Sequence, residues 1–403
     1  MFGGGLYRCN GLIKRNAIAS NIGESAGGEL SDCDGDIVSN EIWDNTAAEG
    51  GGLWGCDGRI SGNLISGNKA AGEDSKGGGL LDCDGTIIWN TIEGNSCDGA
   101  GGGLYGCDGA IQKNTFRNNL SKTRGGGLAL SHSLIENNRV LENSAVHGGG
   151  LTDCDGQVRS NVIAGNSAEG DATSGGGGLL DCNGTIENNT IVGNLATKGG
   201  GLYACNGVVK NCIIWGNTAE EAGPQLLAVS IPTYSCIQDW TGGGQGNTAM
   251  FPVFVDPDGP DDYADTYDDN NYRLSWSFGV PNACIDKGKN EAWMQGAEDR
   301  DGNVRIYYGI NSMTVDMGAY EYGSWKFKIT GAAMVAISEI QLSWASRVGD
   351  QYVVWSIPAM RGPGIIPPPW KREATLTAQE RITMWTDPDA TGRMKFYRIE
   401  EVH

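Results

Sequence analysis

The sequence predicts an all-β chain in which a parallel β-helix, a solenoid of stacked short strands, is followed by a small β-sandwich. Three observations predict this fold: a motif that recurs every 23 to 28 residues, identical residues at fixed places in that motif, and a change of composition after residue 323. Glycine supplies 65 of the 403 residues and proline only 12, so neither a collagen-like nor a proline-rich disordered chain fits.

The repeated unit has the pattern GGGL-x-x-x-C-D/N-G-x-I-x-x-N-x-I-x-x-N-x-A. Apolar and polar residues alternate within it, which is strand periodicity, and about 23 residues are too few for two helices with their turns. Units this short cannot bury an apolar face alone, so they must stack on one another about 4.8 Å apart. Nine turns follow from the anchor leucines Leu6, Leu30, Leu53, Leu80, Leu104, Leu128, Leu151, Leu179 and Leu202.

Cysteine and asparagine recur at the same places of successive turns and predict internal ladders. Cysteines about 4.8 Å apart with parallel Cβ directions suit a column of reduced, buried thiols, because a disulfide needs Cβ atoms about 3.8 Å apart. Stacked asparagines can hydrogen-bond along the solenoid and tolerate left-handed backbone at its corners. The ladders include Cys33, Cys56, Cys83 and Cys107, and Asn45, Asn68, Asn95 and Asn119. We place Cys97 in an insertion loop, and Cys236 and Cys284 could form a bridge.

Three regions are expected along the chain. They are the regular β-helix at 1–223, irregular closing coils with an acidic loop at 224–323, and a C-terminal β-sandwich module at 324–403. The last region contains five tryptophans, little glycine and alternating strand patterns such as EIQLSW and QYVVWS. Its GPGIIPPPW stretch is expected to be a loop or an edge, because proline cannot donate to a strand ladder.

The repeats, for instance GGGLYGCDGAIQKNTFRNN at 101–119, resemble the right-handed parallel β-helix, especially the surface repeats of polymorphic outer-membrane proteins and related bacterial secreted proteins. Residues 251–322, called the closing segment below, resemble the end of β-helix surface proteins of the choice-of-anchor Q kind through FPVFVDP, PNACIDKG, EDRDGNVR and TVDMGAYEY. The resemblance implies that this segment terminates the helix. The last module resembles fibronectin-like modules of secreted bacterial proteins through LSW, TMWTDPDATG and KFYRIE. Little is implied about activity, because this scaffold carries lyases, hydrolases, adhesins and fibre proteins alike.

Calcium is the one cofactor that the sequence suggests. Calcium takes about six to eight oxygen ligands, and carboxylates are dense in the closing segment. The candidate ligands are Asp256, Asp258, Asp261, Asp262, Asp299, Asp301 and Asn303, with Asp265, Asp268 and Asp269 nearby. Asp299 to Asn303 has the D-x-D-G-N look of a calcium loop, but Ile310 stands where such a loop has a glutamate. The alternative is a solvated acidic loop.

The outer face of the solenoid offers candidates for glycan binding. Aromatic residues one place after the anchor leucine have the opposite parity to it and are expected to point outward. The candidate ligand-binding residues are Tyr7, Trp54, Tyr105, Tyr203, Asp82 and Asp153, with Trp43, Trp89 and Trp215 as further stacking platforms. The recurring CDG aspartates exchange with asparagine in three turns, which indicates turn chemistry, and a shallow cation- or glycan-binding strip is the alternative.

Charge and motifs narrow the class of function. The formal net charge of -20 repels nucleic acid and anionic lipid, and no apolar run is long enough to span a membrane. Neither a serine–histidine–aspartate order nor a phosphate-binding loop occurs. The best catalytic cluster is His132, His147, Arg124 and Asp153, where the cysteine ladder is interrupted. A single irregular turn more often reflects tolerated sequence variation than a catalytic site, so no catalytic residue is assigned.

We therefore expect a non-enzymatic, extracellular or bacterial cell-surface solenoid with a structural or adhesive role. A polysaccharide lyase or hydrolase, and a glycan-binding protein without turnover, are the alternatives. The chain begins in phase with a repeat, as in a processed mature form or a fragment of a longer rod, so its first turn presents an unpaired strand edge. Head-to-tail filaments of this chain are a further hypothesis. The expected partners are other copies of the chain, glycans or cell-surface components.

Overall fold

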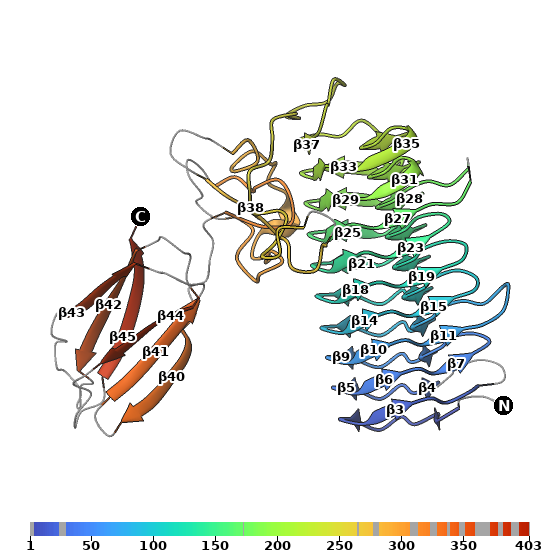
Figure 1. Cartoon of the computed structure of the whole chain (residues 1–403), viewed down its shortest axis with the longest axis horizontal. Coiled ribbons are helices and arrows are strands. Elements are labelled where there is room, and N and C mark those ends of the chain that lie inside the picture. The colour runs from blue at the N-terminus through green and yellow to red at the C-terminus, as the bar shows by residue number, and fades with distance from the viewer. Residues whose placement is uncertain are drawn as a thin grey trace. The chain divides into compact units, whose positions relative to one another are not determined.

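The computed structural model describes residues 4–23, 30–171, 173–263, 266–276, 282–306, 313–322, 329–336, 339–345, 351–358, 371–377, 382–387 and 395–402. The chain divides into two compact units, Met1–Ser324 and Trp325–His403. The first unit is a parallel β-solenoid of about nine turns together with the closing segment, and the second contains antiparallel sheets (Figure 1). The predicted fold class is confirmed.

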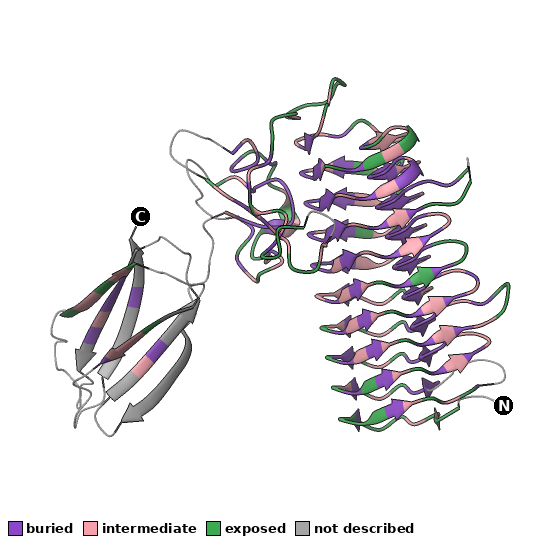
Figure 2. Cartoon of the chain, viewed as in Figure 1, coloured by how far each residue is buried: buried purple, intermediate pink, exposed green. Residues whose placement is uncertain are grey.

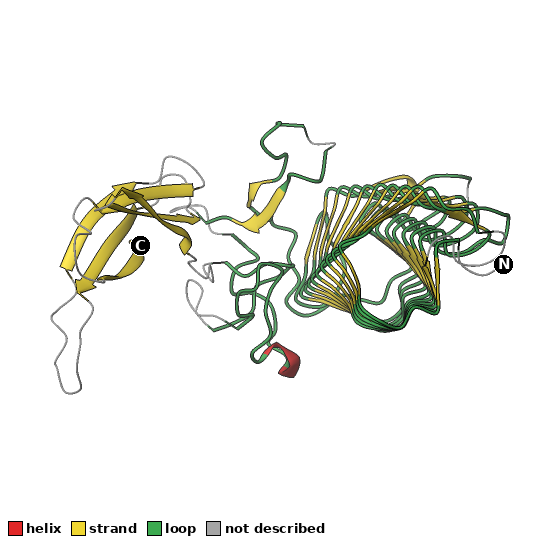
Figure 3. Cartoon of the chain, turned by 90° about the horizontal axis from the view of Figure 1, so that it is seen from below, coloured by secondary structure: helices red, strands yellow, loops and turns green. Residues whose placement is uncertain are grey.

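Four parallel sheets run along the solenoid, built from short strands that stack turn upon turn (Figure 3). Sheet A consists of β1 (Leu6–Tyr7), β4 (Leu30–Ser31), β8 (Leu53–Trp54), β12 (Leu80–Leu81), β16 (Leu104–Tyr105), β20 (Leu128–Ala129), β24 (Leu151–Thr152), β28 (Leu179–Leu180), β32 (Leu202–Tyr203) and β36 (Leu226–Leu227). Sheet B consists of β2 (Ile13–Lys14), β5 (Ile37–Val38), β9 (Ile60–Ser61), β13 (Ile87–Ile88), β17 (Ile111–Gln112), β21 (Leu134–Glu136), β25 (Gln157–Arg159), β29 (Thr185–Glu187) and β33 (Val208–Lys210).

The other two sheets complete each turn. Sheet C consists of β3 (Ala17–Ala19), β6 (Glu41–Trp43), β10 (Leu64–Ser66), β14 (Thr91–Glu93), β18 (Thr115–Arg117), β22 (Arg139–Leu141), β26 (Val162–Ala164), β30 (Thr190–Val192), β34 (Ile213–Trp215) and β37 (Cys236–Ile237). Sheet D consists of β7 (Thr46–Ala47), β11 (Lys69–Ala70), β15 (Ser96–Cys97), β19 (Leu120–Ser121), β23 (Ser144–Ala145), β27 (Ser167–Ala168), β31 (Leu195–Lys198) and β35 (Thr218–Ala222).

One apolar core fills the interior of the solenoid (Figure 2). Equivalent residues of successive turns are neighbours because the strands pair in register, as Leu53 does with Leu80 and Ile65 with Ile92. These four side chains are fully buried. Burying each of them contributes about 1.5–3 kcal/mol to the free energy of folding. The apolar positions of the repeat therefore point inward, as predicted.

Two asparagine ladders hold the corners of the turns together. The backbone N–H and the side-chain Nδ2 of Asn95 both donate to Oδ1 of Asn119 in the next turn, at 3.1 and 3.0 Å. Nδ2 of Asn95 also donates to the carbonyl oxygen of Ile65 in the preceding turn, at 2.9 Å. The same pattern repeats at Asn45, Asn68 and Asn119. Each buried amide therefore links three turns, as predicted for the ladder. The left-handed corner residue is the one before each asparagine, as at Gly94 and Asn118, so the expected left-handed backbone at the ladder asparagines is wrong.

A column of buried thiols runs beside the apolar core. Its free, fully buried members include Cys33, Cys56, Cys83 and Cys107. The backbone N–H of Cys83 donates to Sγ of Cys107 at 3.2 Å, and Sγ of Cys83 donates to the carbonyl oxygen of Leu81 at 3.4 Å. The structure thus contains the predicted reduced ladder.

Cys97 does not lie in an insertion loop, so that prediction is wrong. It belongs to β15, where it is buried and stands between Ala70 and Ser121 of the neighbouring turns. All three residues are small and occupy the place two residues after the second ladder asparagine. This place is buried against the loop between sheets D and A, where Sγ of Cys97 lies 3.3 Å from Oγ of Ser75. It belongs to sheet D, whose strands are too short to show alternation in the sequence.

The C-terminal end of the solenoid is covered by side chains that close the ladders. Oε1 of Gln225 accepts a hydrogen bond from Nδ2 of Asn217 at 2.8 Å, and Nε2 of Gln225 donates to the carbonyl oxygen of Asn217 at 3.0 Å. Oγ of Ser235 accepts the backbone N–H of Cys212 at 3.1 Å. Trp240 packs against the apolar core. Strands β36 and β37 therefore form a partial coil that finishes the solenoid.

The closing segment lies along the side of the solenoid (Figure 1). It contains an antiparallel pair, β38 (Phe254–Asp256) and β39 (Asn271–Leu274), and the short 3-10 helix η1 (Ala292–Met294). Its buried residues pack on outward-facing apolar side chains of sheet C, namely Leu141, Val162, Ala164, Val192 and Ile213. The expectation that this segment terminates the helix is corrected, because the partial coil before it covers the end.

The second unit contains two three-stranded antiparallel sheets. One has the order β40 (Ile329–Ala336), β41 (Glu339–Ala345), β44 (Ile382–Asp387), and the other has the order β43 (Lys371–Thr377), β42 (Gln351–Pro358), β45 (Lys395–Val402). Its buried apolar residues include Leu342, Tyr352, Val354 and Ile399. The predicted strands EIQLSW and QYVVWS correspond to β41 and β42. The proline-rich stretch before β43 lies outside the described residues.

Candidate functional site

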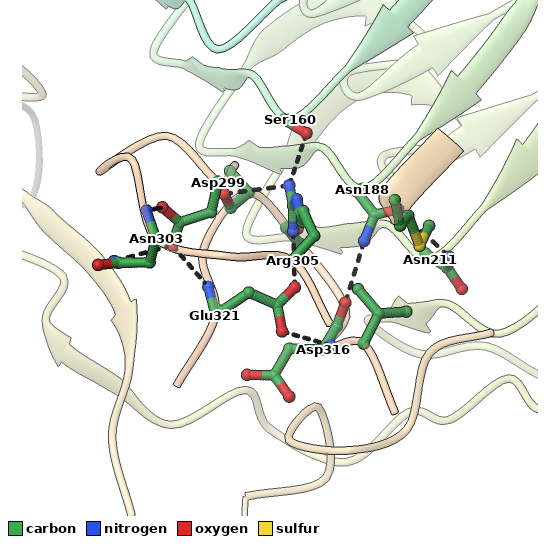
Figure 4. Close-up of polar contacts among 12 residues, drawn as sticks. Ser160, Asn188, Asn211, Asp299, Asn303, Arg305, Asp316 and Glu321 are labelled. Atoms are coloured by element: carbon green, nitrogen blue, oxygen red, sulfur yellow. Dashed lines mark hydrogen bonds and ion pairs between the residues drawn. The ribbon is translucent and has the colours of Figure 1, made fainter. Parts of the chain in front are cut away.

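A set of buried polar groups joins the closing segment to the solenoid, and we call it the seam (Figure 4). Arg305 is fully buried at its centre. Its Nη1 donates to Oε1 of Glu321 at 2.9 Å and to the carbonyl oxygen of Gly318 at 3.1 Å. Its Nη2 donates to Oγ of Ser160 at 2.6 Å and to the carbonyl oxygen of Ala319 at 3.2 Å. Because Ser160 belongs to the solenoid, the guanidinium ties the two parts together.

Corner residues of the solenoid supply the other side of the seam. Ser160, Asn188 and Asn211 occupy the corner between sheets B and C in successive turns, and all three have positive φ. Nδ2 of Asn188 donates to the carbonyl oxygen of Asp316 at 3.1 Å, and Oδ1 of Asn211 accepts the backbone N–H of Lys289 at 2.8 Å. The sequence alone did not reveal these residues. The available signal was the apolar outward residues of sheet C, which occur in every turn from Leu141 of β22 onward.

Asp299 organises a tight turn within the seam. Its Oδ1 accepts the backbone N–H groups of Asp301 and Asn303 at 2.9 and 2.8 Å. Its Oδ2 accepts the backbone N–H of Glu321 at 3.0 Å and Nδ2 of Asn303 at 3.2 Å. The carboxylate of Asp301 is bound by Arg273 at 2.5 and 2.6 Å. Protein donors therefore occupy the oxygens proposed as calcium ligands at 299–303, and this geometry gives the calcium loop no support.

The predicted calcium ligands of the acidic loop are not gathered around one point. Oδ1 of Asp261 accepts a hydrogen bond from the backbone N–H of Tyr263 at 3.0 Å, and its Oδ2 accepts one from the Thr266 hydroxyl at 2.9 Å. Asp265 lies outside the described residues. The other candidates of this loop are Asp256, Asp258, Asp262, Asp268 and Asp269. Among the residues that the structure describes, no group of three or more His, Cys, Asp or Glu side chains could hold a metal ion.

Burial changes the ionisation of the carboxyl groups in the seam. The two carboxylate oxygens of Asp316 accept the backbone N–H groups of Asp286 and Tyr322, at 2.7 and 2.6 Å. Burial outweighs these hydrogen bonds and raises the pKa of Asp316 to about 7. Burial likewise raises the pKa of Asp299 and that of Glu321. The seam therefore holds protons at pH values where exposed carboxyl groups have lost them.

The aromatic residues that follow the anchor leucines point away from the core, but they do not form a continuous strip. In sheet A, the buried side chain of Leu81 separates Trp54 from Tyr105. The glycine loop that begins each turn also folds over this row, since a Cβ at Gly101 would lie 2.6 Å from Cβ of Tyr105. Half-buried members of the row are Trp54, Tyr105 and Tyr203, and the exposed member is Tyr7.

The aspartates of the CDG sequence form an exposed ladder of their own. Oδ1 of Asp57 accepts the backbone N–H of Asp84 at 2.9 Å, and Oδ1 of Asp84 accepts that of Asp108 at 2.8 Å. Oδ1 of Asp155 accepts the backbone N–H of Asn183 in the same way, at 2.7 Å. Oδ1 of Asn183 likewise accepts the backbone N–H of Asn206 at 2.9 Å, so aspartate and asparagine supply the same acceptor. None of these residues has a positive φ, so the exchange reflects this acceptor and not a left-handed turn.

Asp82 and Asp153, two candidates for ligand binding, lie in different turns beside cationic side chains. Nη1 of Arg124 donates to Oδ2 of Asp153 at 3.1 Å, and its Nη2 lies 3.8 Å from Oδ2 of Asp181. Nζ of Lys76 lies 5.4 Å from the ring centroid of Tyr105, next to Asp82. Partial burial raises the pKa of Asp82 and that of Asp153. Asp153 and Arg124 are thus in contact, whereas Asp82 belongs to another group of residues.

His132 and His147, the histidines of the candidate catalytic cluster, make contacts with the backbone of neighbouring turns. Nδ1 of His132 accepts the backbone N–H of Asp155 at 3.4 Å, so His132 replaces an aspartate in the exposed ladder. The backbone N–H of His132 donates to Oδ1 of Asp108 at 2.8 Å. His147 pairs with Arg124 through an isolated backbone bridge. These contacts are structural, and we assign no catalytic step to the cluster.

The fold and the seam define a class of protein: a parallel β-solenoid with a closing segment packed against its side. Comparisons of the chain with protein-family models, with characterised proteins and with solved structures found no match. In the part of the chain that the structure describes, no helix is long and apolar enough to cross a membrane.

Proposed function

We propose that this chain is a non-enzymatic structural or adhesive solenoid that works outside the cell or on a bacterial cell surface. The observation that carries the proposal is that polar side chains of the repeats make contacts between turns in three separate ladders, as those of Asp84, Cys83 and Asn95 do. Such ladders stabilise a scaffold of repeating surface, each turn resting on its neighbours. The resemblance of the repeats to those of polymorphic outer-membrane proteins supports the location.

The chemistry of the buried thiols is compatible with an oxidising environment. Burial raises the pKa of Cys83 and that of Cys182 well above the ordinary range of a thiol. Because the thiolate is the reactive form, these cysteines resist oxidation and exchange. A column of free cysteines therefore does not confine the protein to a reducing compartment, although free thiols are the rule there.

A glycan-binding role is favoured by one exposed tryptophan. Trp89 follows β13 at the corner between sheets B and C and is 59% exposed. Nζ of Lys113 lies 5.3 Å from its ring centroid. The equivalent residue of the preceding turn is Gly62, and the nearest atom to a Cβ built there would be Oγ of Ser39 at 3.7 Å. The ring thus stands beside an open corner, where its apolar face can stack on a sugar.

The test is to incubate the purified chain with acidic and neutral polysaccharides and to measure both cosedimentation and the release of new chain ends. We expect binding without new ends, and weaker binding after Trp89→Ala. The control is Tyr263→Ala, which removes another exposed aromatic ring, 69% exposed, in the closing segment. New ends that increase with protein concentration would overturn the non-enzymatic proposal. No binding to any polysaccharide would exclude the glycan-binding role.

A further inference from the structure

Three arginines from distant parts of the chain converge beside the seam, and we call them the arginine cluster: Arg139, Arg273 and Arg300. Arg139 begins β22 of the solenoid, and the other two belong to the closing segment. The guanidinium of Arg273 lies 4.9 Å from the ring centroid of Tyr320. Burial raises the pKa of the Tyr320 hydroxyl, and the nearby charges of all three arginines oppose that rise. Tyr320 therefore marks the point around which the cluster gathers.

The positive charge of the cluster is only partly neutralised. Arg273 forms a two-pronged ion pair with Asp301. Arg139 donates to the backbone carbonyl oxygens of Tyr267 and Asp268, which carry no full charge. In the described residues, the guanidinium of Arg300 makes no hydrogen bond or ion pair, and its Nε is buried without a partner. Among the described residues, the guanidinium groups of Arg139 and Arg300 thus have no carboxylate partner, in a chain whose net charge is -20.

Burying Arg300 beside two other arginines lowers the free energy of unfolding of the chain. Burial lowers the pKa of Arg300, and the charges of Arg139 and Arg273 act in the same direction. A buried donor without an acceptor carries the full penalty of its desolvation, and a charged one carries more. Within the described residues the hydroxyl of Tyr320 also makes no hydrogen bond. The N–H donors of Arg300 and the hydroxyl of Tyr320 could therefore bond to a ligand that brings hydrogen-bond acceptors and negative charge.

We propose that the arginine cluster binds an oxyanion, such as a carboxylate or sulfate group, which Arg300 and Tyr320 contact directly and Arg139 and Arg273 stabilise by charge. The planar guanidinium presents its N–H donors as a fork that matches two oxygens of such a group. The ligand would bridge β22 of the solenoid and the closing segment. The oxyanion belongs either to a free inorganic anion or to the acidic group of a sugar. The inference does not depend on the proposed function.

The experiment measures thermal unfolding and calorimetric binding with sodium sulfate and with a galacturonate disaccharide, against sodium chloride of equal ionic strength. We expect both oxyanions to raise the unfolding temperature more than chloride does. Arg300→Gln should abolish this difference and weaken binding at least about tenfold, because hydrogen bonds to a charged group are lost. Arg59→Gln removes an exposed charge from the solenoid and should respond as the parent chain does. Tyr320→Phe should weaken binding less than Arg300→Gln.

The outcomes separate the site from its ligand. Arg300→Gln removes no hydrogen bond or ion pair among the described residues. We therefore expect it to unfold in chloride at the parent temperature or above, and this measurement establishes that the variant is folded. Binding of sulfate alone supports an inorganic ligand, and binding of the disaccharide alone or of both supports an acidic sugar. Equal responses of the parent chain and Arg300→Gln, or no response to either anion, overturn the proposal. Neither result bears on the cosedimentation test, so the proposed function stands or fails separately.

Discussion

The solenoid is stabilised by residues that recur at the same place in successive turns and bond to one another. The buried asparagines show this effect most directly. Asn95 accepts the backbone N–H and Nδ2 of Asn68 on one side and donates twice to Asn119 on the other. Replacing it by alanine leaves the backbone N–H and one side-chain donor of Asn68 buried without their acceptor, and each such group costs about 1–3 kcal/mol. Removing one amide therefore damages the turns on both sides.

We expect Asn95→Ala to lower the free energy of unfolding by about 3 kcal/mol or more. Urea unfolding followed by circular dichroism measures the change. The control is Leu120→Ala, which shortens a side chain 45% exposed on the neighbouring β19 and should change the free energy by about 0.5 kcal/mol or less. Equal effects of the two substitutions would show that the asparagine ladder does not stabilise the turns.

The thiol column gives a second prediction for single residues. All twelve cysteines are free, and only Cys9, in the first turn, is partly exposed. We expect iodoacetamide at pH 8 to modify Cys9 alone in the native chain and every cysteine after unfolding, because burial keeps the reagent away from the other sulfur atoms. Intact-mass spectrometry counts the modified residues. Rapid labelling of Cys83 or Cys107 in the native chain would contradict the ladder.

Among the elements, the closing segment depends on a few buried groups. Arg305 donates four hydrogen bonds there, and it shares an ion pair with Glu321. We expect Arg305→Met to destabilise the seam by about 3–5 kcal/mol, since it leaves a buried carboxylate without its partner. Hydrogen exchange should then rise in the closing segment while the solenoid core stays protected. Arg59→Met is the matched surface control. Unchanged exchange in Arg305→Met would show that Arg305 does not hold the closing segment against the solenoid.

The seam should also be less stable as pH rises. An acid whose pKa is higher in the folded state than in the unfolded state binds its proton more tightly when folded, so protonation favours folding. For Asp316, with a folded pKa of about 7 and an unfolded pKa of about 3.9, stability falls between about pH 4 and pH 7. Asp299 and Glu321 act in the same direction.

We expect the unfolding temperature of the seam to decrease from pH 5 to pH 8, and we expect Asp316→Asn to flatten this slope. Differential scanning calorimetry at several pH values measures both. Asp57→Asn changes an exposed ladder residue, whose place asparagine already takes in other turns, and it should leave the slope unchanged. A slope that is the same in all three chains would refute the assignment to Asp316.

The elements also show which parts of the structure the sequence could predict. The strands, the ladders and the inward residues followed from one repeated motif, because neighbouring turns are only 23 to 28 residues apart. The seam joins Ser160 to Arg305, 145 residues apart, and no repeat encodes that contact. The sequence drew attention to the D-x-D-G-N pattern, but the hydrogen bonds of Asp299 to backbone N–H groups depend on the fold and could not be derived from it. The arginine cluster likewise combines β22 with the closing segment.

For the whole molecule, the cover over the last turn of the solenoid bears on self-assembly. In the first described turn, Asn16 and Asn21 donate to the next turn, and within the described residues nothing donates to their own side-chain oxygens. At the other end, Gln225 and Ser235 occupy the corresponding places of a further turn. Head-to-tail stacking therefore requires the covered end to open first.

Opening that end would break the hydrogen bonds of Gln225 and Ser235 and expose core that Trp240 now covers. The new contacts would have to offset this cost, because unpaired strand edges attract partners only while they are free. We expect the purified chain to remain as separate particles in sedimentation velocity and negative-stain microscopy up to high concentration. Weakening the cover by Gln225→Ala with Trp240→Ala should increase association, and Leu120→Ala should not. Filaments of the parent chain would instead establish the head-to-tail assembly and show that the cover yields to a second copy.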